Sequence, residues 1–92
     1  MSEPEPSTRC ATELIEEEYA RAIAAFPDGF RSPHEGYAIL LEEVDELWDE
    51  VKGKRDPETM ARMKKEAVQV GAMAVRFLVM LGVPSPTTRS EP

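Results

Sequence analysis

Carboxylates crowd one stretch of this chain. Between Glu35 and Glu50 there are seven Asp and Glu residues and no Lys or Arg. Glutamates four residues apart on a helix repel one another, at a cost of about 0.2–0.5 kcal/mol per pair. A purely structural surface would intersperse lysines. The run therefore indicates either a solvated acidic face or a group of oxygens that binds a cation.

Helical geometry separates these acids into two groups. At about 100° per residue, Glu43, Glu46 and Glu50 fall within about 60° of one another, beside the apolar stripe of the same segment. The other acids of the run point further toward solvent. Glu43 and Glu46 thus form an edge pair that can face a neighbouring helix.

A further carboxylate lies on the apolar face of a later segment. In the same projection Glu66 falls between methionines, a valine and a phenylalanine. A carboxylate there is costly unless it is paired, protonated or bound to a metal. The alternatives are a buried salt bridge, for example to Arg62 or Arg76, and a place near the end of the bundle that reaches water.

Three predicted helices position these groups. Ser32, Pro33 and Glu35 form a capping sequence that starts the second helix, and Asp56 followed by Pro57 starts the third. No segment alternates polar and apolar residues as a strand does, so the predicted fold class is all-α. The expected helices span residues 8–26, 33–52 and 57–82, the first ending before a Pro-Asp-Gly turn and the other two at glycines.

The short connection between the second and third helices favours an antiparallel hairpin. Glu43 and Glu46 lie 10 and 7 residues before Gly53, and Glu66 and Gln69 follow at comparable distances after the start of the third helix. At 1.5 Å per residue the midpoints of the two pairs differ in height by only about 3 Å. Three carboxylates and an amide oxygen then converge, a set that suits Mg²⁺ or Mn²⁺.

The chain is long enough for one small domain. Residues 1–7 and 84–92 are rich in proline and are expected to be disordered tails, which leaves a helical domain over residues 8–83. Three helices of this size bury their apolar stripes poorly alone. We therefore expect a homodimer that completes a four-helix or larger bundle.

Charge and composition exclude several classes of protein. Eighteen acids against 11 bases give a net charge of −7, which argues against a nucleic-acid partner. Cys10 is the only cysteine, so neither an internal disulfide nor a Cys-rich zinc site is expected. No apolar run is long enough for a membrane span, and no signal peptide is evident, so we expect a cytoplasmic protein without a membrane partner.

The acidic motifs resemble a known enzyme family. Glu43-x-x-Glu46, followed about twenty residues later by Glu66-x-x-Gln69, is similar to the E-x-x-E and E-x-x-D motifs of the MazG-like, all-α nucleoside triphosphate pyrophosphohydrolases. The resemblance covers residues 34–81. It implies hydrolysis of an NTP or dNTP to the monophosphate and pyrophosphate, a Mg²⁺ cofactor held by the four motif positions, and assembly as dimers or tetramers.

The resemblance also implies roles for individual residues. Glu43 or Glu46 would act as the catalytic base or a metal ligand, and Glu66 as a ligand from the next helix. Gln69 stands where the family has aspartate, so it would be a weaker, neutral ligand for Mg²⁺. Three alternatives follow. The site binds one metal fewer, or Glu50 or Glu42 supplies the missing carboxylate ligand. In the third, the protein is a catalytically attenuated scaffold that binds metal or nucleotide.

Basic and aromatic residues leave alternatives open. Lys54 and Arg55 either reach triphosphate oxygens or complement the C-terminus of the second helix. Arg76 either contacts phosphate or pairs with acids of the facing helix. Trp48 and Tyr37 either stack on a nucleobase or pack in a core or dimer interface. A di-iron carboxylate bundle is disfavoured, because it needs E-x-x-H pairs that this sequence lacks.

Overall fold

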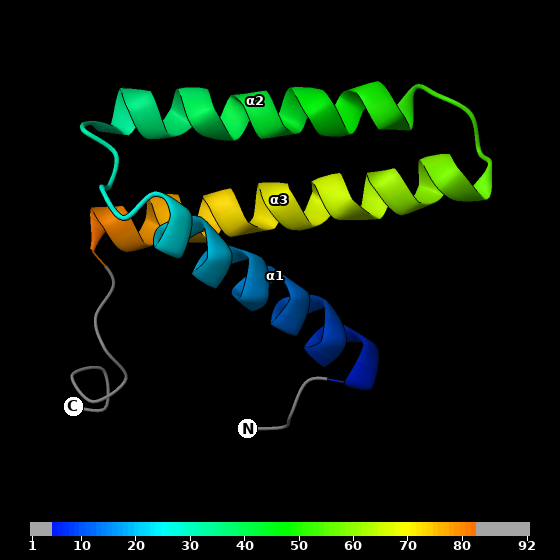
Figure 1. The fold of residues 1–92 in the computed structure, drawn as a ribbon, viewed down its shortest axis with the longest axis horizontal. Helices are drawn as coiled ribbons and strands as arrows, with labels where there is room; N and C mark the ends of the chain where they lie inside the picture. The colour runs from blue at the N-terminus through cyan, green and yellow to red at the C-terminus, as the bar shows by residue number, and fades with distance from the viewer. Residues whose placement is uncertain (1–4, 83–92) are drawn as a thin grey trace.

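A computed structural model describes residues 5–82 of the 92-residue chain, and this part contains three helices and no strand. Helix α1 spans Pro6–Ala25, α2 spans Pro33–Val51 and α3 spans Pro57–Leu81. The all-α prediction is therefore confirmed for the described residues. Figure 1 shows α2 and α3 side by side, with residues 52–56 turning the chain back at one end, while α1 crosses α3 obliquely.

The starts of α2 and α3 follow the capping residues read from the sequence. Ser32 Oγ accepts a hydrogen bond from the Glu35 backbone N–H at 3.2 Å, and the Glu35 carboxylate in turn accepts one from the Arg31 N–H at 2.6 Å. Asp56 Oδ1 accepts from the Thr59 N–H at 2.7 Å. These side chains satisfy N–H groups that have no partner within the helix, and so fix where each helix begins.

The start of α1 differs from the sequence prediction. The helix begins at Pro6, with Glu5 as its N-cap, so Pro6 and Ser7 belong to the first turn and not to an N-terminal tail. Proline is well suited to this position, because the N–H it lacks would have no partner there. The other predicted tail, residues 84–92, and residues 1–4 lie outside the described part of the chain.

Helix α3 is the centre of the fold, because both other helices pack against it. Glycines permit close approach on its two sides. A Cβ on Gly71 would lie 2.7 Å from Ile15 Cδ1 of α1, and one on Gly36 of α2 would overlap the ring of Phe77. Because α1 and α2 diverge from this common support, a hollow forms between them.

The core of this single chain is thin. Among residues 5–82 the buried hydrophobic side chains are Ala72 and Met73, and the buried polar ones are Thr59 and Arg76. Tyr37 and Trp48, on the predicted apolar stripe of α2, are instead 60% and 56% exposed. No helix in the described residues is long and apolar enough to span a membrane.

Candidate metal centre and adjoining cavity

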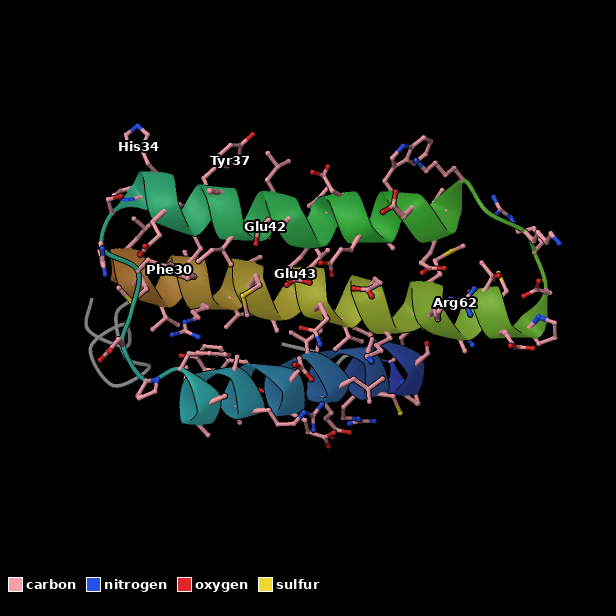
Figure 2. The ribbon with its side chains drawn as sticks, turned by 45° about the horizontal axis from the view of Figure 1, so that its top comes forward. Phe30, His34, Tyr37, Glu42, Glu43 and Arg62 are labelled. Carbon is pink, nitrogen blue, oxygen red and sulfur yellow. The ribbon has the colours of Figure 1, made fainter. Side chains whose placement is uncertain are left out.

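Three carboxylates from α2 and α3 meet across the seam between these helices. Glu43 and Glu46 come from α2 and Glu66 from α3, and one carboxylate oxygen of each lies within 4.8 Å of the others. Glu43 and Glu66 are half-buried and Glu46 is exposed. Figure 2 shows Glu43 directed from α2 toward α3. Each residue thus offers an oxygen ligand to one point between the helices.

The electrostatic state of this cluster is unfavourable without a cation. Burial raises the pKa of Glu66, and the nearby charge of Glu46 raises it further, against a smaller opposing effect of Lys65. Burial also raises the pKa of Glu43, as do the charges of Glu46 and Glu66. Desolvation and repulsion between carboxylates both disfavour the ionised form. A divalent cation bound between the three groups would relieve this repulsion.

The arginines that could have neutralised Glu66 have other partners. Arg62 Nε pairs with Glu50 at 3.0 Å, and Arg76 donates to backbone carbonyls. The buried salt bridge that the sequence left open for Glu66 is therefore absent from the described structure. Glu50 is held by Arg62 and does not belong to the three-carboxylate group, so its suggested role as an additional ligand stays a prediction.

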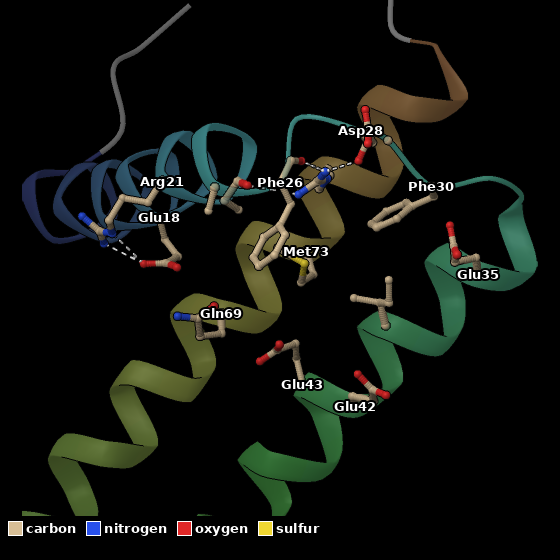
Figure 3. Close-up of a pocket in the computed structure, with 15 residues that line it drawn as sticks. Glu18, Arg21, Phe26, Asp28, Phe30, Glu35, Glu42, Glu43, Gln69 and Met73 are labelled. Atoms are coloured by element: carbon tan, nitrogen blue, oxygen red, sulfur yellow. Dashed lines mark hydrogen bonds and ion pairs between the residues drawn. The ribbon is translucent and has the colours of Figure 1, made fainter.

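Gln69 lies one turn after Glu66 on α3 and lines the same cavity as Glu43. Figure 3 shows these two side chains on opposite sides of the space between α2 and α3. The position that Gln69 takes therefore fits the predicted second pair of the motif. Its amide is neutral, so it would bring no charge to the site, and its role as a ligand stays a prediction.

A cavity of about 580 Å³ meets the three-carboxylate group at Glu43, which is the member of that group that lines it. It lies between the end of α1, the α1–α2 loop, the first half of α2 and the middle of α3. Apolar and aromatic side chains cover much of it, and polar groups stand at its edge, which is the usual character of a small-molecule site. The residues on its apolar wall include Ala22, Ala25, Phe26, Phe30, Ile39 and Met73.

Arg76 closes one wall of this cavity by tying α3 to the end of α1. Its guanidinium donates to the carbonyls of Ala22 at 3.4 Å and Asp28 at 2.8 Å, and also to that of Phe26. Its Cζ lies 5.2 Å from the centroid of the Phe30 ring. Arg76 thus uses both terminal nitrogens of its guanidinium in the contact between α3 and α1, and its contact with phosphate stays a prediction. The signal for the contact with α1 was weak, because the sequence does not reveal which helix end an arginine will meet.

In the α2–α3 loop, Arg55 makes hydrogen bonds close to its own position in the chain. Arg55 donates to the Val51 carbonyl at 2.8 Å and the Gly53 carbonyl at 3.3 Å, and so satisfies the C-terminal end of α2. This is the structural alternative that the sequence analysis weighed for the basic loop. Lys54 is exposed. Contact of either residue with a substrate stays a prediction.

Comparison of the chain with protein-family models, with curated proteins and with solved structures finds no match. The interpretation of the site therefore depends on its own geometry. Three carboxylates around one point can hold a hard cation, and the cavity with apolar walls that Glu43 and Gln69 line can hold an organic molecule next to it.

Proposed function

We propose that the protein is a Mg²⁺-dependent nucleoside triphosphate pyrophosphohydrolase, which converts an NTP or dNTP to the monophosphate and pyrophosphate. The observation that carries this proposal is the meeting of Glu43, Glu46 and Glu66 across the α2–α3 seam, within 4.8 Å. Glu43 also lines a cavity of about 580 Å³. Nucleoside triphosphates are anionic, and a protein with a net charge of −7 needs a cation to hold one.

The three glutamates have distinct tasks in this proposal. Glu66 and one of the α2 glutamates hold the metal, with Gln69 as a neutral additional ligand. The other α2 glutamate accepts the proton of the attacking water, a role that its raised pKa favours if it is Glu43. Mg²⁺, or Mn²⁺ in its place, would clamp phosphate oxygens and activate water. The base and sugar would occupy the adjoining cavity, where Phe26 and Phe30 offer aromatic surface.

We further propose that the α2–α3 pair is an antiparallel hairpin that a homodimer or tetramer completes to a four-helix bundle. The thin core supports this, because two buried hydrophobic residues in the described chain leave many large apolar side chains in contact with water. A cytoplasmic location remains our expectation from the sequence.

Incubation of the full chain with Mg²⁺ or Mn²⁺ and a panel of NTPs and dNTPs tests the activity. We expect equal amounts of monophosphate and pyrophosphate from at least one nucleotide, and loss of both products in Glu66→Gln. Asp45→Asn is the matched control, because this exposed acid of α2 is outside the three-carboxylate group. Failure to release pyrophosphate from any nucleotide would refute the enzyme.

The alternative is an attenuated relative that binds metal or nucleotide without turnover. Gln69 is the observation that favours it, since a neutral amide leaves three negative charges where four would hold two metals more firmly. Gln69→Asp separates the two functions. A large gain in pyrophosphate release over an almost inactive wild type would support attenuation, whereas an active wild type that gains nothing would show that glutamine is a competent ligand.

A further inference from the structure

Helix α2 exposes a row of large apolar side chains on one flank. Tyr37, Leu41, Val44 and Trp48 are 60%, 41%, 40% and 56% exposed. Their spacing of four, three and four residues places them within about 60° of one another around the helix. Figure 2 shows Tyr37 directed away from α3. Such a row on an otherwise polar helix surface marks a contact surface.

This row faces away from the cavity. The residues of α2 that line the cavity are Ile39, Glu42 and Glu43, together with Glu35. In helical projection they fall on the opposite flank of α2 from the exposed row. One flank of the helix is therefore acidic and borders the candidate site, and the other is apolar and exposed to solvent.

Helix α3 extends the same surface. Gln69, Met73 and Arg76 line the cavity, so the opposite flank of α3 lies on the same side as the apolar row of α2. That flank is again free of charge. On this flank Met63 is half-buried and the other residues are exposed; its members are Met60, Met63, Ala67, Ala74, Leu78 and Leu81. We call this flank of α3 and the apolar row of α2 together the back face.

The order of side chains on the back face is nearly the same in both directions along each helix. In α2, Tyr37 and Trp48 lie equally far from a midpoint between residues 42 and 43, as do Leu41 and Val44. In α3 the midpoint lies between residues 70 and 71. Residues of similar size again lie at equal distances from it, namely Met60 with Leu81, Met63 with Leu78, and Ala67 with Ala74.

The two midpoints also lie at the same height. Gly36, six and a half residues before the α2 midpoint, is close to Phe77, six and a half residues after the α3 midpoint. The Glu50–Arg62 pair agrees with this register to within one residue. One axis perpendicular to both helices can therefore pass through both midpoints, as a two-fold axis relating two copies requires.

We propose that a second copy of this chain covers the back face, with α2 antiparallel to its counterpart and α3 antiparallel to its counterpart. In this arrangement Tyr37 of each copy meets Trp48 of the other, and the small residues Ala67 and Ala74 meet where the α3 helices approach. No charged residue belongs to the back face, so two strongly acidic chains associate there without pairing like charges. The inference rests on the homo-oligomer of the proposed function and specifies its surface and register.

Cysteine cross-linking tests the register in the full chain with Cys10→Ser as background. Tyr37→Cys combined with Trp48→Cys should give a covalent dimer under mild oxidation, and so should Ala67→Cys combined with Ala74→Cys. Each single variant should stay uncross-linked, because the two copies of position 37 lie about 16 Å apart along the helix axis, beyond disulfide reach. Single variants that cross-link as readily as the pairs would overturn the proposed register.

Sedimentation of the untagged chain tests the association itself. We expect a dimer, or a tetramer built from it, whose dissociation constant rises at least 100-fold in Leu41→Asp. Leu14→Asp, at a 52% exposed position of α1 outside the back face, should have no such effect. A monomer at every concentration, or association only with a different protein, would reject the inference. Pyrophosphate release is measured separately, so a cross-linked but inactive dimer would refute the hydrolase and leave the back face assigned.

Discussion

Arg76 and Glu66 are both charged side chains on the inner side of α3, but their surroundings differ. Arg76 is 6% exposed, and carbonyl groups at the end of α1 and in the following loop accept the hydrogen bonds of its guanidinium. Glu66 is half-buried beside two further carboxylates, and the described chain places no arginine against it. One charge is satisfied within the fold, and the other is placed among like charges.

This difference separates a structural charge from a functional candidate. Burying a charge costs free energy that hydrogen bonds or opposite charges must offset. Arg76 receives that compensation from backbone carbonyls that carry the negative end of the α1 dipole. Within the described residues, Glu66 receives only the smaller opposing effect of Lys65, so a cation from solution is the partner that would complete its surroundings.

Replacement of Arg76 has the largest expected effect on stability. Arg76→Met keeps much of the side-chain volume but removes the hydrogen bonds that join α3 to the end of α1 and the following loop. We therefore expect the free energy of unfolding to fall by about 2–4 kcal/mol. Urea denaturation followed by circular dichroism measures this change. Arg76→Lys, which keeps the charge but not the planar group of donors, should lose less. An unaltered midpoint for Arg76→Met would show that α1 does not depend on this contact.

Replacement of Glu66 should have the next largest effect, on metal binding. Glu66→Gln removes one of the three carboxylates that we propose as ligands, and we expect the Kd for Mg²⁺ to rise about 100-fold or more. Isothermal titration calorimetry of the metal-free chain measures it. Lys65→Gln is the matched control on the neighbouring position and should change affinity far less. Equal affinities for wild type and Glu66→Gln would place the cation elsewhere.

The sequence predicted the surroundings of Glu66 better than those of Arg76. Helical periodicity and residue rise are local properties, so they sufficed to place Glu43, Glu46 and Glu66 at one height. The hydrogen bonds of Arg76 to the end of α1, and the cavity beside them, depend on the angle at which α1 crosses α3. Gly71 and Ile15 set that crossing through a contact 56 residues apart in the chain, which no local pattern encodes.

The apolar stripe of α2 shows a second limit of the sequence. Leu40, Leu47 and Val51 are at least half-buried, whereas Tyr37 and Trp48 on the same stripe are exposed. Periodicity identifies an apolar stripe but does not tell how much of it one neighbouring helix covers. The stripe of α2 is wider than α3 alone can bury, so Tyr37 and Trp48 do not pack in the core of the single chain. Their packing in a dimer interface, and stacking on a nucleobase, stay predictions.

The raised pKa values of Glu43 and Glu66 predict an unusual pH dependence. A carboxyl with a higher pKa in the folded state binds more protons when folded, so its contribution to stability falls as pH rises above the ordinary glutamate value of 4.5. Without divalent cations, Glu66→Gln should therefore unfold at a higher temperature than wild type at pH 7, but not at pH 4. Thermal melts at the two pH values measure this difference.

Saturating Mg²⁺ should reverse the order at pH 7, because the cation stabilises only a folded chain that binds it. Asp45→Asn serves as the control in both series, since it removes a charge from the exposed side of α2. A wild type that is more stable than Glu66→Gln at pH 7 without metal would contradict the repulsion inferred for the three carboxylates.

The smallest expected effect concerns Arg62. It pairs with Glu50, as a structural charge does, but that pair lies near the three carboxylates. Its pair with Glu50 is partly exposed, with 54% of the Arg62 side chain open to solvent, so Arg62→Ala should change the free energy of unfolding by less than about 1 kcal/mol. Removal of the guanidinium also releases Glu50, whose charge already acts on Glu66 and raises its pKa. The released carboxylate adds to the charge near the cluster, so Mg²⁺ affinity should increase slightly in Arg62→Ala and return to the wild-type value in Arg62→Ala combined with Glu50→Gln. If the single variant instead binds Mg²⁺ more weakly, Arg62 supports the metal centre directly and the division between structural and functional charges fails at this residue.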